Sequence, residues 1–215
     1  MTIGASLLAG TQAGGAAAET AATTTRIDFE NTEIGRLPPG FTTGLTGGGG
    51  PVRWVVATDA TAPAGPKVLA QTSTDRTDHR FPLAILDAPL LADLAVSVRF
   101  KPVAGEIDRA AGIALRLTDA ANYYVVRANA LEDNVRLYHV VGGVRTQFAG
   151  LDVKIPSGAW QQLAIAARGR NFEVSLDGKT LFSATDTRLT TAGRVALWTK
   201  ADSVTYFDDL QIRNL

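Results

Sequence analysis

The stretch DAANYYVVRANALEDNVRLY, residues 119–138, decides the fold of this chain. It predicts two β-strands, residues 123–129 and 135–138, joined by a polar turn at residues 131–134. Both strands are dense in β-branched and aromatic residues, and the turn carries residue types that end strands. The segment therefore predicts a hairpin whose strands also carry polar side chains that are costly to bury without partners.

The rest of the chain after residue 25 shows the same short, alternating segments. Gly142-Gly143 and Asp177-Gly178 supply the positive φ angles that tight hairpin turns need. No segment keeps a helical period for more than two turns, so the pattern predicts an all-β antiparallel two-sheet sandwich. The further predicted strands are residues 26–30, 54–58, 67–72, 81–86, 94–100, 113–117, 162–168, 172–176, 180–184, 195–198 and 204–212.

Composition excludes several classes of function. The 215 residues carry 21 basic and 21 acidic side chains, a balance that argues against a nucleic-acid or anionic-membrane partner. The chain has no cysteine and only two histidines, His79 and His139, which argues against disulfides, thiolate chemistry and a multi-histidine zinc site. No run approaches about 18 consecutive apolar residues, so we expect no membrane span.

Residues 1–25 differ from everything that follows. They are small, uncharged up to Glu19, and poor in large apolar residues after Leu8. The run Ala16-Ala17-Ala18 fits a secretory cleavage site, although no basic residue precedes the short apolar run. We interpret the segment as a remnant signal peptide or a disordered leader, and expect a secreted or periplasmic single domain over residues 26–215.

Four segments together resemble a known family. They are the hairpin NYYVVRANALEDNVRLY, then PSGAW at 156–160, LDGKTLF at 176–182 and LWTKADSVTYFDDLQI at 197–212. The set resembles secreted bacterial concanavalin A-like jelly rolls, related to laminin G-like modules and often labelled family-sixteen glycoside-hydrolase-like or 3-keto-disaccharide hydrolase-like. The resemblance implies a jelly-roll sandwich of the concanavalin A-like lectin/glucanase type, and its functional labels follow from fold analogy.

A hydrolase would normally need two carboxyl groups across the scissile bond. Laminarinase-type jelly rolls place them as Glu-x-Asp-x-x-Glu on one strand. The only partial match here is Glu106-Ile107-Asp108, which lacks the third acid at Ala111 and is predicted to be a loop. The laminarinase mechanism is therefore not supported, and no catalytic residue is assigned. Glu132 either solvates the hairpin turn or places a carboxylate over the sheet.

Polar and aromatic side chains of matching strand parity indicate a binding face. Aromatic rings with fixed donors suit a sugar, which is apolar on its C–H faces and hydroxylated at its edge. If Arg127 and Arg136 bind the ligand, their side chains would point with Tyr138 and Trp198 into an open concavity. If these arginines are structural, they would instead pair with acidic side chains. The predicted ligand-binding residues are Arg127, Asn129, Arg136, Tyr138, Trp198, Lys200 and Glu132.

A second candidate site lies where the first and last strands are expected to meet. Asp208 has the inward parity of Leu210 and Ile212 and needs a partner. With Asp28 and Glu30 it could supply oxygens to a structural Ca²⁺, or it could instead accept backbone N–H groups or pair with an arginine.

The sequence thus predicts an exported domain that binds a carbohydrate on its concave sheet. The alternatives are a glycoside hydrolase of the 3-keto-disaccharide hydrolase type and a non-enzymatic adhesion module. The sequence indicates neither the glycan nor an oligomeric state.

Overall fold

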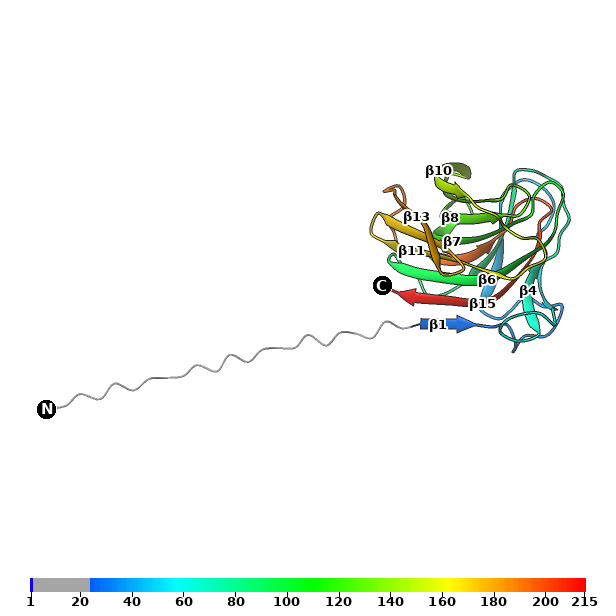
Figure 1. Cartoon of the computed structure of the whole chain (residues 1–215), viewed down its shortest axis with the longest axis horizontal. Helices are drawn as coiled ribbons and strands as arrows, with labels where there is room; N and C mark the ends of the chain where they lie inside the picture. The colour runs from blue at the N-terminus through cyan, green and yellow to red at the C-terminus, as the bar shows by residue number, and fades with distance from the viewer. Residues whose placement is uncertain (2–23) are drawn as a thin grey trace.

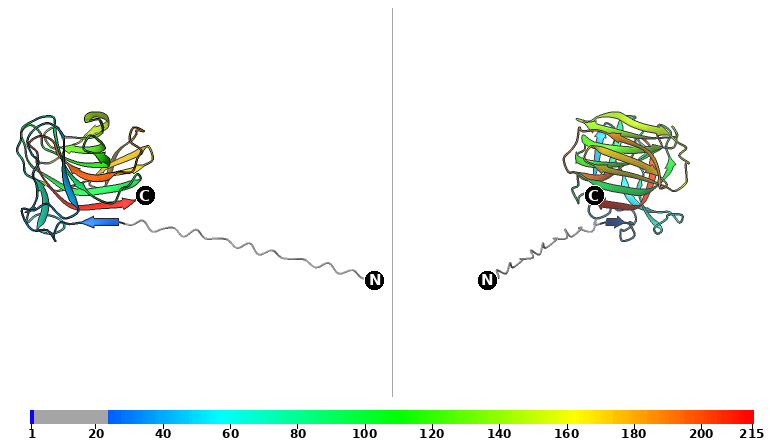
Figure 2. Two further views of the ribbon diagram at one scale, coloured as in Figure 1. Left: turned by 180° about the vertical axis from the view of Figure 1, so that it is seen from behind. Right: turned by 60° about the vertical axis from the view of Figure 1, so that its left-hand side comes forward.

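A computed structural model describes Met1 and residues 24–215, and in them fifteen strands form two antiparallel sheets (Figures 1 and 2). The eight-stranded sheet has the order β13-β12-β11-β6-β15-β4-β3, and β1 also pairs with β15. Its strands are β13 (Lys179–Thr185), β12 (Asn171–Leu176), β11 (Gln161–Arg168), β6 (Leu94–Ala104), β15 (Val204–Asn214), β4 (Lys67–Gln71), β3 (Trp54–Thr58) and β1 (Thr24–Ile27).

The seven-stranded sheet has the order β10-β9-β8-β7-β14-β5-β2. Its strands are β10 (Val144–Asp152), β9 (Asn134–Val141), β8 (Asn122–Asn129), β7 (Ala110–Asp119), β14 (Arg194–Trp198), β5 (Arg80–Leu86) and β2 (Phe41–Gly47). The two sheets confirm the predicted all-β sandwich, and the predicted hairpin is β8–β9.

Alternate residues of each sheet fill the core between them. Val98 and Phe100 of β6 are fully buried in it, together with Val126 of β8 and Leu137 of β9. Because side chains alternate along a strand, the neighbours of Val126 and Leu137 point to the opposite face of the seven-stranded sheet. We call that second surface, which is turned away from the eight-stranded sheet, the outer face.

The pairing registers confirm both predicted tight turns. Val141 pairs with Val144 around Gly142-Gly143, and Leu176 pairs with Lys179 around a turn in which Asp177 and Gly178 both have positive φ. Such two-residue turns match the twist of the strands that they join.

Two strands were not predicted, β2 and β10. They are the two edges of the seven-stranded sheet, where each strand has a neighbour on one side only. Most residues of β10 are exposed or half-buried, so its sequence VRTQFAGLD lacks the apolar alternation of a central strand. The edge position therefore explains the missing signal.

The first and last strands meet, as predicted. β1 pairs with β15, with Arg26 opposite Gln211, and lies beside it in Figures 1 and 2. It begins at Thr24, two residues before the predicted start of the domain. The predicted signal peptide lies almost entirely outside the described residues. The described part of the chain holds no helix of the length and apolarity that crossing a membrane requires.

Candidate functional site

The predicted binding residues of the hairpin share one face. Arg127 of β8 lies opposite Arg136 of β9, and Val125 lies opposite Tyr138. On the other side of Arg127 comes Gly112 of β7, which in turn lies opposite Trp198 of β14. Since directly paired residues point to the same side of a sheet, these side chains all belong to the outer face. Strand parity predicted this shared face.

The aromatic rings of this face form a packed layer. The rings of Phe81 and Trp198 stack with centroids 5.4 Å apart, and Trp198 Nε1 donates to Tyr123 OH at 3.3 Å. Gly112 makes room for the indole, because a Cβ there would lie 3.1 Å from Trp198 Cε3. Trp198 has no exposed surface and Tyr138 retains 7%. The prediction that these rings point into an open concavity is therefore wrong. They form a buried layer under the outer face, which we call its floor.

Arg145 of β10 covers that floor. Its guanidinium carbon lies 4.5 Å from the ring centroid of Tyr138, 4.7 Å from Phe81 and 5.7 Å from Trp198. Cations over aromatic faces are attracted by the ring quadrupole. Burial lowers the pKa of Arg145, and the nearby charge of Arg127 lowers it further. Sequence analysis missed this residue because it lies on an unpredicted edge strand.

A charged group lies beside the aromatic floor, where β14 ends and β7 begins. Lys200 Nζ lies 2.7 Å from Asp78 Oδ1 and 2.9 Å from Asp108 Oδ2. Asn129 Nδ2 donates to Asp108 Oδ1 at 2.9 Å. Burial raises the pKa of Asp108, although Lys200 opposes the shift. The predicted residues Asn129 and Lys200 thus converge on Asp108, an acid that the sequence placed in an unassigned loop.

The backbone of that loop is held by a carboxylate. Asp202 accepts hydrogen bonds from the N–H groups of Glu106, Ile107 and Asp108 at 2.8–3.2 Å. Burial tends to raise the pKa of Asp202, but these bonds to the charged form outweigh it and the net shift is downward. Asp202 therefore positions Asp108. Only the tertiary contact identifies it.

The two arginines of the hairpin each have an acidic partner. Arg127 Nη2 lies 2.7 Å from Glu132 Oε2 and donates to Asn134 Oδ1 at 2.7 Å. Arg136 pairs with Asp152, and its side chain crosses β10 where Gly150 leaves room for it. The arrangement expected for structural arginines is therefore present.

Glu132 is nevertheless open to solvent. Its side chain is 48% exposed. Burial tends to raise its pKa, but the hydrogen bonds from Arg127 and Asn134 lower it overall. Asp108 and Glu132 thus have pKa values moved in opposite directions at one end of one face.

We call this group the hairpin site. It combines an aromatic floor with charged groups that range from the buried Asp108 and Arg127 to the exposed Glu132. Its members are Asp78, Phe81, Asp108, Arg127, Asn129, Glu132, Arg136, Tyr138, Arg145, Trp198 and Lys200.

The predicted calcium ligands do not form such a group. Asp208 accepts Ala64 N–H at 2.8 Å and Asp209 N–H at 2.7 Å, and Glu30 accepts Lys67 N–H at 2.7 Å. No set of three His, Cys, Asp or Glu side chains in residues 24–215 is arranged to hold a metal ion. The backbone alternative for Asp208 is therefore observed, and calcium binding by Asp28, Glu30 and Asp208 stays a prediction without geometric support.

We expect Asp208 to make stability depend on pH. Burial, with Asp209 and Glu30 nearby, raises its pKa to about 6. The folded state then binds this proton more tightly than the unfolded state, so stability falls as pH rises from about 4 to about 6. This contribution is up to about 3 kcal/mol. Urea unfolding at pH 4.5, 5.5 and 7 should show a flatter profile for Asp208→Asn than for the native chain.

Identical profiles for the two proteins would contradict this assignment. The same measurement with a calcium chelator tests the metal prediction. A loss of stability on chelation would support a bound ion, and no change would contradict it.

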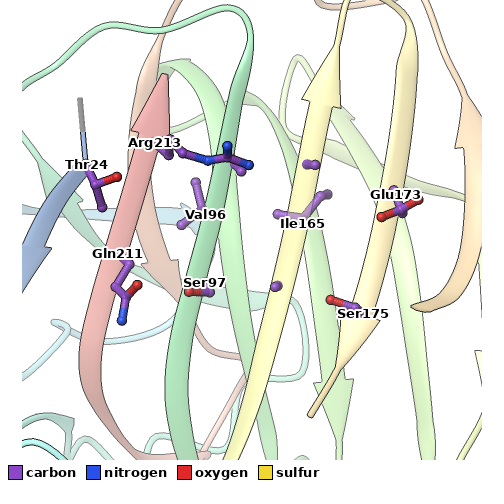
Figure 3. Close-up of a pocket in the computed structure, with 11 residues that line it drawn as sticks. Thr24, Val96, Ser97, Ile165, Glu173, Ser175, Gln211 and Arg213 are labelled. Carbon is purple, nitrogen blue, oxygen red and sulfur yellow. The ribbon is translucent and has the colours of Figure 1, made fainter. Parts of the chain in front are cut away.

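A shallow pocket of about 270 Å³ lies elsewhere, on the exposed surface of the eight-stranded sheet (Figure 3). Gln211 of β15, Ser97 of β6 and Ser175 of β12 form a row across this surface, with β11 between the last two, and Arg213 and Glu173 also line the pocket. No aromatic ring lines this pocket. Among the described strands of this sheet, Val103 is the only exposed large apolar residue, so the surface offers no apolar patch of the kind expected for adhesion.

Comparison with solved structures defines the class of fold. The carbohydrate-binding module CBM66 from Bacillus subtilis superposes with a TM-score of 0.63 at 19% identity, over 80% of this chain and 94% of that one. The β-glucanase of Bacillus licheniformis gives 0.60 at 12% identity, over 89% and 98%. The chain therefore has the concanavalin A-like jelly-roll fold.

A third structure extends the likeness. Domain 4 of AbnA, an extracellular arabinanase from Geobacillus stearothermophilus, solved in complex with arabinotriose, gives a TM-score of 0.57 at 17% identity, over 90% of this chain and 93% of that one. At these identities the likeness concerns the fold. No protein-family model and no curated protein sequence matches the chain.

Proposed function

We propose that this chain is an exported carbohydrate-binding domain that binds a glycan at the hairpin site. The observation that carries the proposal is the convergence of donors, acceptors and aromatic rings at one end of the outer face. A sugar presents hydroxyl groups that both donate and accept, and such a ligand suits exposed carboxylate and guanidinium groups side by side. Two of the structural neighbours, a carbohydrate-binding module and a domain in complex with arabinotriose, support the proposal.

The groups that reach solvent are the ones expected to touch the ligand. Glu132 is 48% exposed and Arg136 is 20% exposed, whereas Arg127 is 3% exposed. Lys200 pairs with the buried Asp108 at the edge of the site. The rings of Tyr138 and Trp198 then support the site from below, and Arg127 holds Glu132 in place.

Replacing Arg136 with alanine is expected to weaken glycan binding about ten-fold or more, because hydrogen bonds to charged groups contribute roughly 1.5–3 kcal/mol. Stability should change by less than about 1 kcal/mol, since the pair with Asp152 is largely exposed. Calorimetric titration of a neutral and acidic oligosaccharide panel, with parallel melting curves, measures both. The matched control is Arg26→Ala, which removes an exposed pair with Asp209 on the other sheet.

Unchanged affinity in both Arg136→Ala and Glu132→Gln would place the glycan elsewhere. Failure of the full chain to bind any member of the panel would contradict the function itself. An Arg136→Ala variant that loses no more affinity than the control Arg26→Ala would count against the site as well.

A glycoside hydrolase is the second candidate. Paired carboxyl groups whose pKa values are pushed apart are the arrangement of a general acid and its partner. Asp108 and Glu132 have pKa values shifted in these opposite directions, but only Glu132 reaches solvent, since Asp108 is 1% exposed. The same panel is therefore followed for new reducing ends. Release by the native chain that disappears in Glu132→Gln would favour the hydrolase, and intact oligosaccharides would favour the binding domain.

A further inference from the structure

Arg145 differs from the other cations of the hairpin site. Lys200 pairs with Asp78 and Asp108, Arg127 pairs with Glu132, and Arg136 pairs with Asp152. The Arg145 side chain has neither an ion pair nor a hydrogen bond within residues 24–215, and its only specific contacts are with the three aromatic rings.

Two guanidinium nitrogens of this site lack partners. Arg145 Nη1 and Arg127 Nε are both buried and neither has a hydrogen-bond acceptor among the described residues. Both guanidinium groups lie over the ring of Tyr138, with carbons 4.5 Å and 5.7 Å from its centroid. Two like charges therefore share one ring, and buried donors without acceptors are costly. An anion placed between them would relieve both costs.

The position of Arg145 makes it reachable. It lies near the start of β10, the edge strand of the seven-stranded sheet, three residues after Gly142 of the tight turn. The residue is half-buried, whereas Arg127 is almost fully buried. No hydrogen bond to the protein holds the guanidinium, so it can turn toward a ligand that arrives over the sheet edge.

We propose that the glycan of the hairpin site carries an anionic group, a carboxylate or a sulfate ester, that binds Arg145. This inference rests on the proposed function and specifies its ligand class. A guanidinium donates two parallel N–H bonds to a carboxylate or sulfate, the geometry in which such bonds are strongest. The neutral part of the sugar would then lie toward Glu132 and Arg136.

The test uses the full chain and two pairs of matched oligosaccharides. Oligogalacturonate is compared with its methyl ester, and a sulfated galacto-oligosaccharide with its desulfated form. One acidic member is expected to bind at least about ten-fold tighter than its neutral twin. Inorganic sulfate is titrated as well, since binding as tight as that of the sulfated sugar would reveal simple anion capture and overturn the inference.

Variants assign the preference to a residue. Arg145→Met should abolish the preference, so that the acidic and neutral twins bind with equal affinity, while methionine still covers the rings. Arg145→Lys should keep part of it, since an ammonium retains the charge without the two parallel bonds. The lysine variant also keeps the proposal testable if the methionine variant folds poorly. The control is Arg170→Met, which removes an exposed charge at the β11–β12 turn.

The outcomes separate this inference from the function on which it rests. Equal binding of acidic and neutral twins would overturn the anionic ligand while the binding function stands. A preference that persists in Arg145→Met, or that falls equally in Arg170→Met, would overturn the role of Arg145. Absence of binding to every sugar would contradict the function and the inference together.

Discussion

Replacing Arg80 with methionine is expected to destabilise the fold by about 3 kcal/mol, because it removes four hydrogen bonds made by a charged donor and a buried acceptor left without a donor costs about 1–3 kcal/mol. The Arg80 side chain has no exposed surface. Its nitrogens donate to the carbonyl oxygens of Gly50, Pro51 and Ala201 at 2.9–3.2 Å, and to Ser73 Oγ at 3.0 Å. One side chain therefore satisfies backbone carbonyl groups from two segments that are far apart in sequence, and a side-chain hydroxyl from a third.

Methionine would fill most of the volume but leave the buried Ala201 carbonyl without its Arg80 donor, which is the costly part. Lysine should rescue little, because one ammonium cannot reach acceptors spread around a planar fork. Urea unfolding with an unchanged denaturant slope measures the loss. Arg76→Ala is the matched control, since Arg76 lies in the segment just before β5, in an exposed pair with Glu106, and its replacement should cost less than about 1 kcal/mol. Equal effects of the two variants would contradict the role of Arg80.

Truncation of Trp198 to alanine is expected to cost about 3–5 kcal/mol, as for other buried aromatic residues. The indole is fully buried, stacks on Phe81 and donates to Tyr123 OH. Arg145 above it would lose one of its three aromatic contacts. The strand-parity argument expected Trp198 to point into an open concavity, and the burial of its side chain overturns that expectation.

Two variants separate packing from binding. Trp198→Phe keeps a ring against Phe81 and should lose less stability than the alanine variant. Trp160→Ala removes a half-buried indole whose Nε1 donates to Thr61 Oγ1 at 3.2 Å, and should cost clearly less. Melting curves of the three variants give the order. A Trp198→Ala protein as stable as the Trp160→Ala protein would show that the ring is not part of a packed floor.

Strand positions follow from the sequence wherever a strand is central in its sheet. Alternation identified β6 and the β8–β9 hairpin, because one face of each must be apolar to cover the core. The same rule failed at β2 and β10, the edges of the seven-stranded sheet, where burial is incomplete and alternation fades. The failure matters for function, since Arg145 lies on β10.

The candidate site, like the strands, could be predicted from the sequence only in part. Strand parity placed Arg127, Arg136 and Tyr138 on one face, because the period of two is a local property of an extended chain. Strand parity does not predict how deeply a side chain is buried, so the buried rings of Tyr138 and Trp198 were predicted to line an open surface. Nor does it report partners: the pairing of Asp108 with Lys200 joins residues that are 92 positions apart.

By itself the sequence determined the all-β sandwich, the positions of its central strands and the face on which the hairpin residues lie, because these depend on local alternation and turn chemistry. Only the tertiary structure decided which charged groups are buried, which cations of the hairpin site have acidic partners, and that Arg145 has none within residues 24–215. The buried position of Arg80 follows only from the tertiary structure, since its partners include carbonyl groups from distant segments. Arg145 is identified as a candidate binding residue only by the tertiary structure, in which the edge strand β10 places it over three aromatic rings. The physical reason is that desolvation and pairing are set by contacts between segments, which no local pattern records.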